Sequence, residues 1–459
     1  MNLWHYIGAA LMFLLITFAG ILSGRNVKSS AAFSGSDHRA GLGVVTGTIA
    51  GTLVGGASTV GTAQLAFTYG FSAWWFTLGG AIGCLIMALF YAKPLHDKQA
   101  ITMPQILSEE FGRKAALVAA IMSSAGSFLG IVSQLLSGMA LISSVSSISA
   151  LWSSLLIAGL MLFYVFFGGV WGVGIVGIVK TVILWVGIGF CGLIAISAGG
   201  GISSFTAAFP KEQYFNLFAR GLSADLGAGL SLVVGIITTQ TYVQAVLSAK
   251  SARIARKGAV LSAIFIPVIG AAGIFVGMYM KLTHPDIAPA TALPLFILEK
   301  TPPILAGVLL AALLVALVGT GAGLCLGISS MFCRDLYKPY LRPSANDKEQ
   351  LRFTRIAIVI VLFIAGAMSI GNMGSMILGW SFLSLGLRSA VAFFPLNAAL
   401  FCKGKIPSGY VMAAMFLAPV TSIFSKLFIT GIDPLFPGMA ISFLILFVGW
   451  FHRKKCFSH

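Results

Sequence analysis

Two basic side chains lie inside long apolar runs of the sequence, where charge is rare. Lys180 stands in GIVGIVKTVIL and Arg388 in SLGLRSAVAFF. A charge at bilayer depth costs about 2.5 kcal/mol or more, so each must face protein, water or a ligand. Lys180 is a candidate for ion coupling, and Arg388 for holding a substrate carboxylate or governing a gate. The alternatives are that Lys180 snorkels to the cytoplasmic face and that Arg388 caps backbone carbonyls.

Hydroxyl and amide side chains interrupt three other apolar runs. Buried polar groups need partners, and a bound solute would supply them. The alternative is hydrogen bonding between helices, which is worth about 0.6 kcal/mol per pair. With Arg388, the predicted substrate-binding residues are Ser58, Thr59, Gln64, Ser127, Thr239, Gln240, Tyr242 and Gln244, and Gln134 is a further candidate.

The residue types of a catalytic or metal centre are sparse. The six histidines stand near the termini or in expected loops, without the paired spacing of a metal site. The six cysteines form no CxxC pair, and we interpret them as free thiols that pack in the interior. We therefore predict no catalytic residues, no enzyme activity and no cofactor, with a sodium ion as a possible exception.

The composition places these residues in a membrane. Apolar residues make up 58% of the 459 residues and charged residues only 9%, against roughly 25% in soluble domains. A soluble enzyme, a disordered chain and a disulfide scaffold are excluded. The net charge of +17 fits cytoplasmic loops better than nucleic-acid binding, because the basic residues recur between apolar runs. The expected partners are a small-molecule solute and the lipid bilayer, with no nucleic acid and no obligatory protein partner.

The apolar runs predict an all-α polytopic protein of about thirteen transmembrane helices. The first run has no basic segment before it and no clear cleavage site, so it reads as a retained span. With the N-terminus outside and the C-terminus cytoplasmic, 22 of the 29 Lys and Arg residues fall in cytoplasmic segments, as a bacterial inner (plasma) membrane protein would have them. The expected spans are 5–24, 42–69, 73–92, 116–145, 148–168, 171–198, 222–247, 256–281, 304–332, 353–372, 375–401, 408–427 and 435–451.

Two blocks of five spans suggest an inverted repeat, a known transporter design. The first span of each block is interrupted by polar residues, in GTIAGTLVGGASTVGTAQLAF and in LGAGLSLVVGIITTQTYVQA. Such paired interruptions indicate the binding site. The predicted organisation is an extra N-terminal helix and cytoplasmic loop (1–40), the first repeat (41–198), an extracellular loop (199–221), the second repeat (222–401), and two C-terminal helices with a tail (402–459).

Four stretches in order resemble the sodium:solute symporter family. They are the linker AKPLHDKQAITMPQILSEEFG (92–112), GGVWGVGIVGIVKTVIL (168–184), QTYVQAVLSAKSARIARKGA (240–259) and LLAALLVALVGTGAGLCLGISSMFCRDLY (309–337). The resemblance covers nearly the whole chain. It implies a LeuT-type fold with five-plus-five helices, alternating access and sodium coupling.

The resemblance also implies where the sodium ion binds and where this chain departs from the family. The implied ligands are Gly51, Val54, Ala316 and Thr320, and Gly319 stands where a serine usually donates a hydroxyl. A hard cation prefers about six oxygens, so the remaining set needs water or another donor. Two family carboxylates are replaced as well, by Gly177 and Ala322. The amine of Lys180, three residues after Gly177, could stand in for the ion.

Within the family, VGGASTVGTAQLAFTYG and QTYVQAVLS are most similar to the branch of high-affinity choline transporters. That branch places tryptophans where this chain has Leu53 and Thr239. A quaternary ammonium prefers an aromatic cage, so choline is not the expected solute. Two intramembrane cations among amides and hydroxyls instead suggest an anionic or zwitterionic solute.

The sequence therefore predicts a secondary active transporter of a small polar organic solute, coupled to sodium. The alternative is proton coupling or uniport, with Lys180 replacing sodium. A substrate sensor is less favoured, since no segment for a kinase domain follows FHRKKCFSH. A membrane enzyme is disfavoured because the spans lack acid–base sets.

Overall fold

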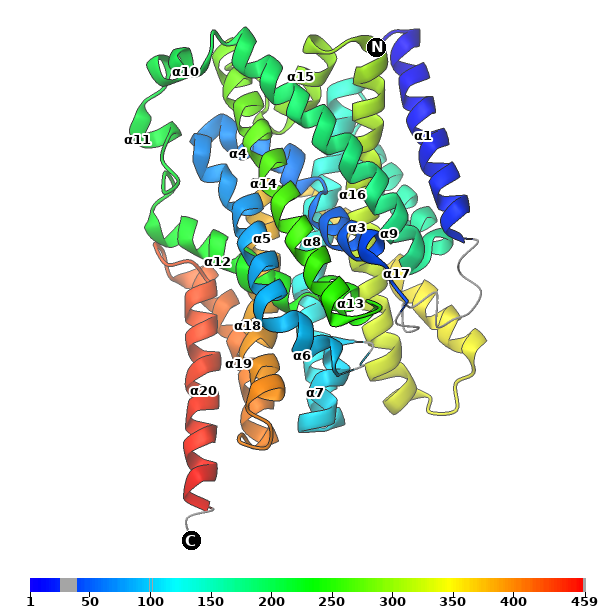
Figure 1. The fold of residues 1–459 in the computed structure, drawn as a ribbon, viewed down its shortest axis with the longest axis vertical. Coiled ribbons are helices and arrows are strands. Elements are labelled where there is room, and N and C mark those ends of the chain that lie inside the picture. Colours follow the sequence, from blue (N-terminus) through cyan, green and yellow to red (C-terminus); the bar gives the residue numbers. More distant parts are fainter. Residues whose placement is uncertain (25–38, 99, 101, 457–459) are drawn as a thin grey trace.

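The computed structural model of this chain is all-helical over the residues that it describes, which are 1–24, 39–98, 100 and 102–456. For residues 19–24, 166–176 and 454–456 it describes the backbone alone. The helices form an elongated bundle, with the two termini at opposite ends of its long axis (Figure 1). These residues form no β-strand, and the one isolated β-bridge among them joins Ala40 to Ala249.

The first predicted block of spans folds into one broken helix followed by long helices. Its elements are α3 (Leu42–Leu53), η1 (Ala57–Gly61), α4 (Thr62–Tyr69), η2 (Gly70–Trp74), α5 (Trp75–Ile86), η3 (Met87–Tyr91), α6 (Ala92–His96), α7 (Met103–Phe111), α8 (Arg113–Val145) and α9 (Ala150–Ala198). A single helical element, α9, thus covers both spans expected at 148–168 and 171–198.

Two short helices, α10 (Ile202–Ala208) and α11 (Lys211–Tyr214), lie in the stretch expected as a loop between the blocks. The second block then begins with a bent pair. Its elements are α12 (Leu222–Thr238), α13 (Gln240–Leu247), α14 (Ala252–Thr283), η4 (Pro289–Thr291), α15 (Ala292–Lys300), α16 (Pro303–Met331), η5 (Phe332–Leu341), α17 (Asp347–Ile370) and α18 (Ile377–Phe401). The helices α1 (Leu3–Gly24), α19 (Ser408–Phe428) and α20 (Leu435–Cys456) flank the two blocks.

Nine helical segments of the described chain are long and apolar enough to cross a membrane, and the bent pair α12 and α13 makes a tenth. Three shorter apolar helices accompany them: Leu3–Phe18, Leu42–Leu53 and Ala150–Val165. The polytopic helical class is confirmed. The count of thirteen spans, the five-plus-five repeat and the domain boundaries stay predictions. The loop expected after the first span lies largely at 25–38, outside the described residues.

Both interrupted spans are broken where their polar residues gather. α3 ends at Leu53, and Val54 leaves the helical region with φ −80° and ψ 87° before η1 resumes the helix. In the second block, Thr239 adopts an extended φ of −79° and ψ of 128°, and the axes of α12 and α13 differ by 43°. Each break releases backbone groups from the helical hydrogen-bond ladder.

A short backbone pairing joins the two broken helices. Ala40 N donates to Ser248 O at 2.9 Å, and Lys250 N donates to Ala40 O at 3.0 Å. Ala40 lies just before α3 and Ser248 just after α13, so the bridge connects the start of the first broken helix to the end of the second.

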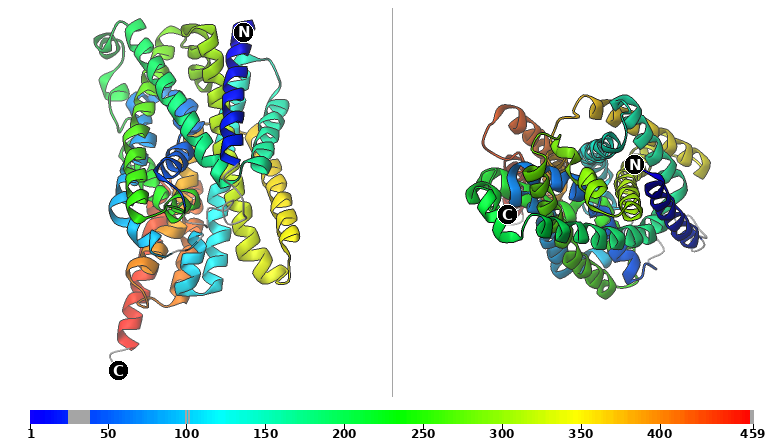
Figure 2. Two further views of the ribbon diagram at one scale, coloured as in Figure 1. Left: turned by 45° about the vertical axis from the view of Figure 1, so that its right-hand side comes forward. Right: turned by 90° about the horizontal axis from the view of Figure 1, so that it is seen from above.

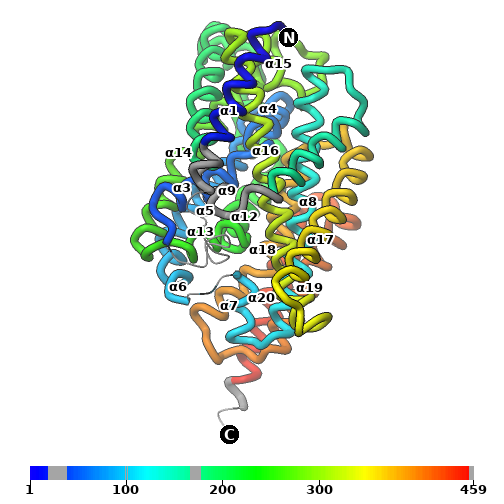
Figure 3. The backbone as a smooth tube through the Cα atoms, turned by 90° about the vertical axis from the view of Figure 1, so that its right-hand side faces the viewer, coloured from blue at the N-terminus to red at the C-terminus, as the bar shows by residue number. Residues whose placement is uncertain are grey.

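The flanking helices cover different sides of the bundle. α1 packs against α16 and α9 (Figure 3), whereas α20 packs against α19 and α18. Seen from above, the two terminal helices lie on opposite sides (Figure 2). The helices that pack most closely around α3 and α13 belong to the two blocks.

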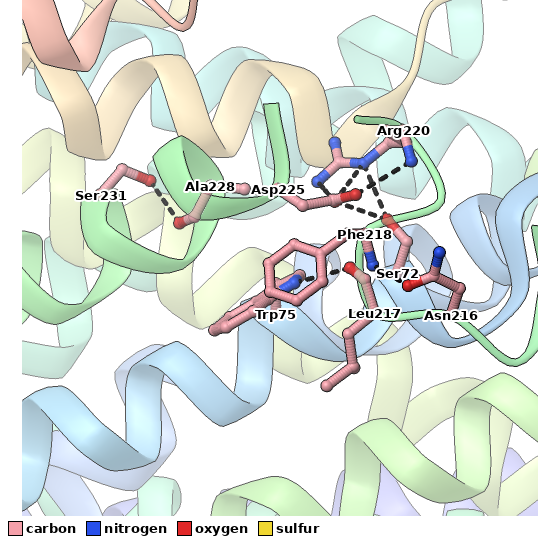
Figure 4. Close-up of polar contacts among 9 residues, drawn as sticks. All are labelled: Ser72, Trp75, Asn216, Leu217, Phe218, Arg220, Asp225, Ala228 and Ser231. Carbon is pink, nitrogen blue, oxygen red and sulfur yellow. Dashed lines mark hydrogen bonds and ion pairs between the residues drawn. The ribbon is translucent and has the colours of Figure 1, made fainter. Parts of the chain in front are cut away.

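A buried ion pair fixes the start of α12 (Figure 4). The Asp225 side chain is 0% exposed, and its Oδ1 lies 2.6 Å from Arg220 Nη2. Ser72 Oγ donates to the same oxygen at 2.6 Å, and Arg220 N donates to Oδ2 at 2.9 Å. The guanidinium also lies 5.2 Å from the ring centroid of Phe382 on α18. The cluster therefore ties together η2, α12 and α18.

We expect Asp225→Asn to lower the melting temperature of the purified protein in detergent by several degrees. Removing one partner of a buried ion pair costs about 3–5 kcal/mol, because the other charge is left uncompensated. The control is Glu109→Gln, which breaks the more exposed 3.6 Å pair with Lys98 and should change stability by about 1 kcal/mol or less. Equal shifts for the two variants would contradict a stabilising role for the buried pair.

Candidate functional site

The break between α3 and η1 exposes backbone groups that the membrane interior cannot hydrate. Neighbouring side chains satisfy them: Ser58 Oγ accepts from Gly55 N at 3.0 Å, and Thr59 Oγ1 donates to Gly55 O at 2.7 Å. From α8, Gln134 Oε1 accepts from Gly56 N at 2.8 Å. The hydroxyls of Ser58 and Thr59, predicted to bind substrate, thus bond to the backbone of the break.

The second break carries a hydroxyl that has no such partner. Thr239 is 2% exposed, and its Oγ1 makes no hydrogen bond in the described structure. Its backbone is satisfied, since Thr239 N donates to Gly235 O at 2.9 Å while Thr239 O accepts from Tyr242 N and Val243 N. A buried hydroxyl left unpaired costs about 1–3 kcal/mol. A ligand that accepts a hydrogen bond from this hydroxyl would therefore bind favourably.

A cavity of ≈ 40 Å³ lies between the two breaks and is walled by η1, α5, α8, α16 and α18. Thr239 and Tyr242 line it from the second break, and Arg388 from α18. The complete lining is Thr52, Leu53, Ala57, Phe76, Gly130, Gln134, Thr239, Tyr242, Thr320, Leu324, Ser381, Ser384, Leu385 and Arg388. The cavity is thus where both interrupted helices meet the rest of the core.

Arg388 brings a positive charge to this cavity. The residue is 5% exposed, and among the described residues no carboxylate forms an ion pair with it. Its Nε donates to Ser384 O at 3.1 Å and its Nη2 to Ser384 Oγ at 2.9 Å. Ser384 Oγ in turn donates to Gly126 O on α8 at 2.6 Å. Ser384 therefore holds one edge of the guanidinium, and Nη1 makes no hydrogen bond to the described residues.

Of the predicted substrate residues, three line the cavity: Thr239, Tyr242 and Arg388. Six do not: Ser58, Thr59, Gln64, Ser127, Gln240 and Gln244. Gln64 braces the start of α18, where its Oε1 accepts from Ile377 N at 2.8 Å. Gln240 Oε1 accepts from Met103 N at the start of α7, also at 2.8 Å. A substrate role for these six residues stays a prediction.

Several lining residues were not predicted from the sequence. Ser384 is four positions before Arg388 and therefore on the same helical face, which is a signal that could have found it. Thr52, Ser381 and Phe76 carry no comparable signal, because their position depends on how the helices pack.

The implied sodium site contains Lys180. Its side chain is 4% exposed, and its Nζ donates to Ala316 O, one of the expected ligand carbonyls, at 3.3 Å. Thr320 Oγ1 donates to Thr52 O at 3.3 Å. A Cβ added to Gly319 would lie 3.4 Å from Lys180 Nζ. The amine is thus in the interior against α16 rather than at the cytoplasmic surface.

The helices α3 and α9 approach each other closely near Lys180. A Cβ on Gly51 would lie 2.7 Å from Gly177 Cα, and a Cβ on Gly177 would meet Gly47 O. The glycine that replaces the family carboxylate therefore lets the two backbones touch. This contact forms one turn of helix away from Lys180 on α9.

Comparison with known proteins gives a consistent match over most of the chain. The model of the "Sodium:solute symporter family" matches residues 38–416. High affinity choline transporter 1 of Homo sapiens is 27% identical over 93% of this chain and 77% of its own length. Sodium/proline symporter 2 of Staphylococcus saprophyticus is 25% identical over 65% of this chain and 62% of its own length.

A solved structure extends the likeness to the fold. A Na⁺-coupled sialic acid symporter in a substrate-bound, outward-open state superposes with a TM-score of 0.81, at 16% identity, over 99% of this chain and 98% of its own. This degree of overlap supports a LeuT-like helical arrangement.

We expect Gly177→Ala to destabilise the purified protein, because the added methyl group meets the backbone of α3. Overpacking of this kind costs about 1–3 kcal/mol, which outweighs the gain of about 1 kcal/mol from replacing glycine in a helix. Thermal melting in detergent measures the effect. Gly189→Ala on the same helix is the control, since its Cβ would have no neighbour within 4 Å. A melting temperature for Gly177→Ala at or above that of Gly189→Ala would rule out the close packing.

Proposed function

The chain belongs to the sodium:solute symporter family, and we propose that the solute it carries is a small polar organic molecule, anionic or zwitterionic, bound in the central cavity. As a family member it is an integral membrane protein and a secondary active, sodium-coupled transporter. Transport by alternating access would open this cavity to each side in turn, with the two breaks as the flexible points.

The observation that carries this proposal is the cationic Arg388 in the cavity wall. A buried guanidinium needs an anion, carbonyls or water. Among the described residues its hydrogen-bond partner is Ser384, at one edge, so a carboxylate on the solute would complete the site. The same charge would repel a cation that entered the cavity.

Choline fits this cavity poorly, although choline transporters are among the relatives. A quaternary ammonium is recognised by faces of aromatic rings around it. Here the aromatic rings among the lining residues are those of Phe76 and Tyr242. Leu53 and Thr239 line the cavity at the positions where the choline branch places tryptophans.

Sodium is the coupling ion that the family indicates, with Gly51, Val54, Ala316 and Thr320 as proposed ligands. One contact favours a second candidate, proton coupling or uniport: Lys180 Nζ already binds Ala316 O. An ammonium at this place would supply the positive charge that sodium supplies in relatives.

Four further assignments accompany the proposal. We propose that the protein performs no covalent chemistry, and that it acts without a nucleic-acid or obligatory protein partner. Its expected location is a bacterial inner (plasma) membrane, with the N-terminus outside and the C-terminus cytoplasmic. A sensor role is the less favoured alternative.

Uptake into proteoliposomes tests the proposed substrate class. We expect an inward sodium gradient to concentrate at least one radiolabelled carboxylate from a panel of organic anions and zwitterionic amino acids. The same panel should include choline and a neutral sugar, and a potassium gradient serves as the control. Accumulation of choline or the sugar alone would overturn the assignment.

The coupling ion can be tested by removing the ammonium. A positive charge about 4 Å from a bound cation opposes binding by several kcal/mol at an effective dielectric constant of about 20. We therefore expect Lys180→Gln to lower the sodium concentration for half-maximal thermal stabilisation by tenfold or more. The control is Lys281→Gln, near the C-terminal end of α14, which should leave that concentration unchanged.

The two coupling candidates differ in the unmodified protein. Sodium coupling gives uptake that needs sodium at both pH 6 and pH 8. Proton coupling gives sodium-independent uptake that varies with pH, and Lys180→Gln removes that pH dependence. Unchanged sodium and pH responses in Lys180→Gln would exclude any role for this amine in coupling.

A further inference from the structure

Three residues that line the central cavity each carry a hydrogen-bond donor with no partner among the described residues. Thr239 Oγ1 is buried and unpaired in the described structure. Arg388 bonds to the protein through Nε and Nη2, and among the described residues its Nη1 bonds to nothing. Tyr242 lines the same cavity, and its hydroxyl has no hydrogen-bond partner among the described residues. A carboxylate has two oxygens with about four acceptor sites, which match such a set of donors.

The cavity offers little to the ammonium group of a zwitterion. None of its lining residues is acidic. Three carbonyls at the breaks already accept hydrogen bonds within the protein. Gly55 O accepts from Thr59 Oγ1, and Thr52 O accepts from Thr320 Oγ1. At the other break, Thr239 O accepts two backbone N–H groups.

The rest of the wall suits a short aliphatic group. Its side chains include Leu53, Phe76, Leu324 and Leu385, which present apolar surface. The volume of ≈ 40 Å³ has room for only a few heavy atoms, since one water needs roughly 10–15 Å³ of such space. The walls therefore favour a small solute with a single charged group.

We propose that the solute is a short-chain aliphatic monocarboxylate, the class to which acetate and propionate belong. Its carboxylate binds Arg388 Nη1 and accepts hydrogen bonds from Thr239 and Tyr242, and its alkyl group packs against Leu53 and Phe76. Ser384 is a positioning residue that orients the guanidinium. This proposal rests on the proposed function and narrows it from anionic or zwitterionic solutes to monoanions.

Binding of radiolabelled propionate to the full chain in detergent, with sodium chloride present, tests the proposal. L-Alanine is the zwitterion of similar size, and choline is the cation. We expect propionate to bind and L-alanine to compete at least tenfold more weakly. Arg388→Gln should weaken propionate binding a hundredfold or more, because the main charge in the site is lost.

A pair of isosteric variants keeps the test informative if Arg388→Gln does not fold. Thr239→Val removes the unpaired hydroxyl, and we expect it to weaken propionate binding about tenfold, as for a hydrogen bond to a charged group. Thr238→Val is the matched control, because its neighbouring hydroxyl already donates to Val234 O at 3.0 Å within α12. That variant should stay within about twofold of the unmodified protein.

The outcomes separate this proposal from the broader one. Binding of L-alanine but not propionate overturns the monocarboxylate proposal and leaves the proposed function standing. Equal effects of Thr239→Val and Thr238→Val overturn the assigned role of Thr239. Binding of none of the three solutes overturns the monocarboxylate proposal and leaves the solute class to the uptake panel. Binding of choline alone overturns both the monocarboxylate proposal and the proposed solute class.

Discussion

The structure depends on one constraint, which is that backbone polar groups cannot be left unpaired in hydrocarbon. Two helices break inside the bundle, and each break must find substitutes for the lost helical bonds. At the first break the substitutes are the nearby hydroxyls of Ser58 and Thr59 and the amide of Gln134. At the second, Thr239 and the turn that follows it pair their own backbone. The breaks are therefore stable features, and the cavity between them is a product of their geometry.

The same constraint explains the character of the site. With several backbone groups at the breaks paired internally, the described lining of the cavity offers the side-chain donors of Thr239, Tyr242 and Arg388. Arg388 adds a charge that no described carboxylate balances. On α9 the buried Lys180 adds a second positive charge, beside the close packing of Gly177 against α3. Lys180 and Arg388 thus give the interior of this protein positive charge, which suits an anionic solute.

The sequence predicted the parts of this arrangement that follow from composition and local chemistry. Broken spans were expected from clusters of Gly, Ser and Thr, and Arg388 from its charge in an apolar run. Gln64 and Gln240 also looked like ligands, yet they brace α18 and α7. The reason is that the rotation of a helix about its axis is set by packing with its neighbours, which a single sequence does not contain. The continuous α9 was missed for a related reason, because apolar periodicity does not mark where one span ends and the next begins.

The bridge at Ala40 gives the two broken helices a shared mechanical behaviour. Two backbone hydrogen bonds join the start of α3 to the end of α13, so the two half-helices are directly linked. Residues at or beside both breaks line the cavity, Leu53 next to the first break and Thr239 at the second. If transport bends the chain at these breaks, we expect the pairing at Ala40 to make the two half-helices move together. A solute bound in the cavity would then lie between the two moving segments.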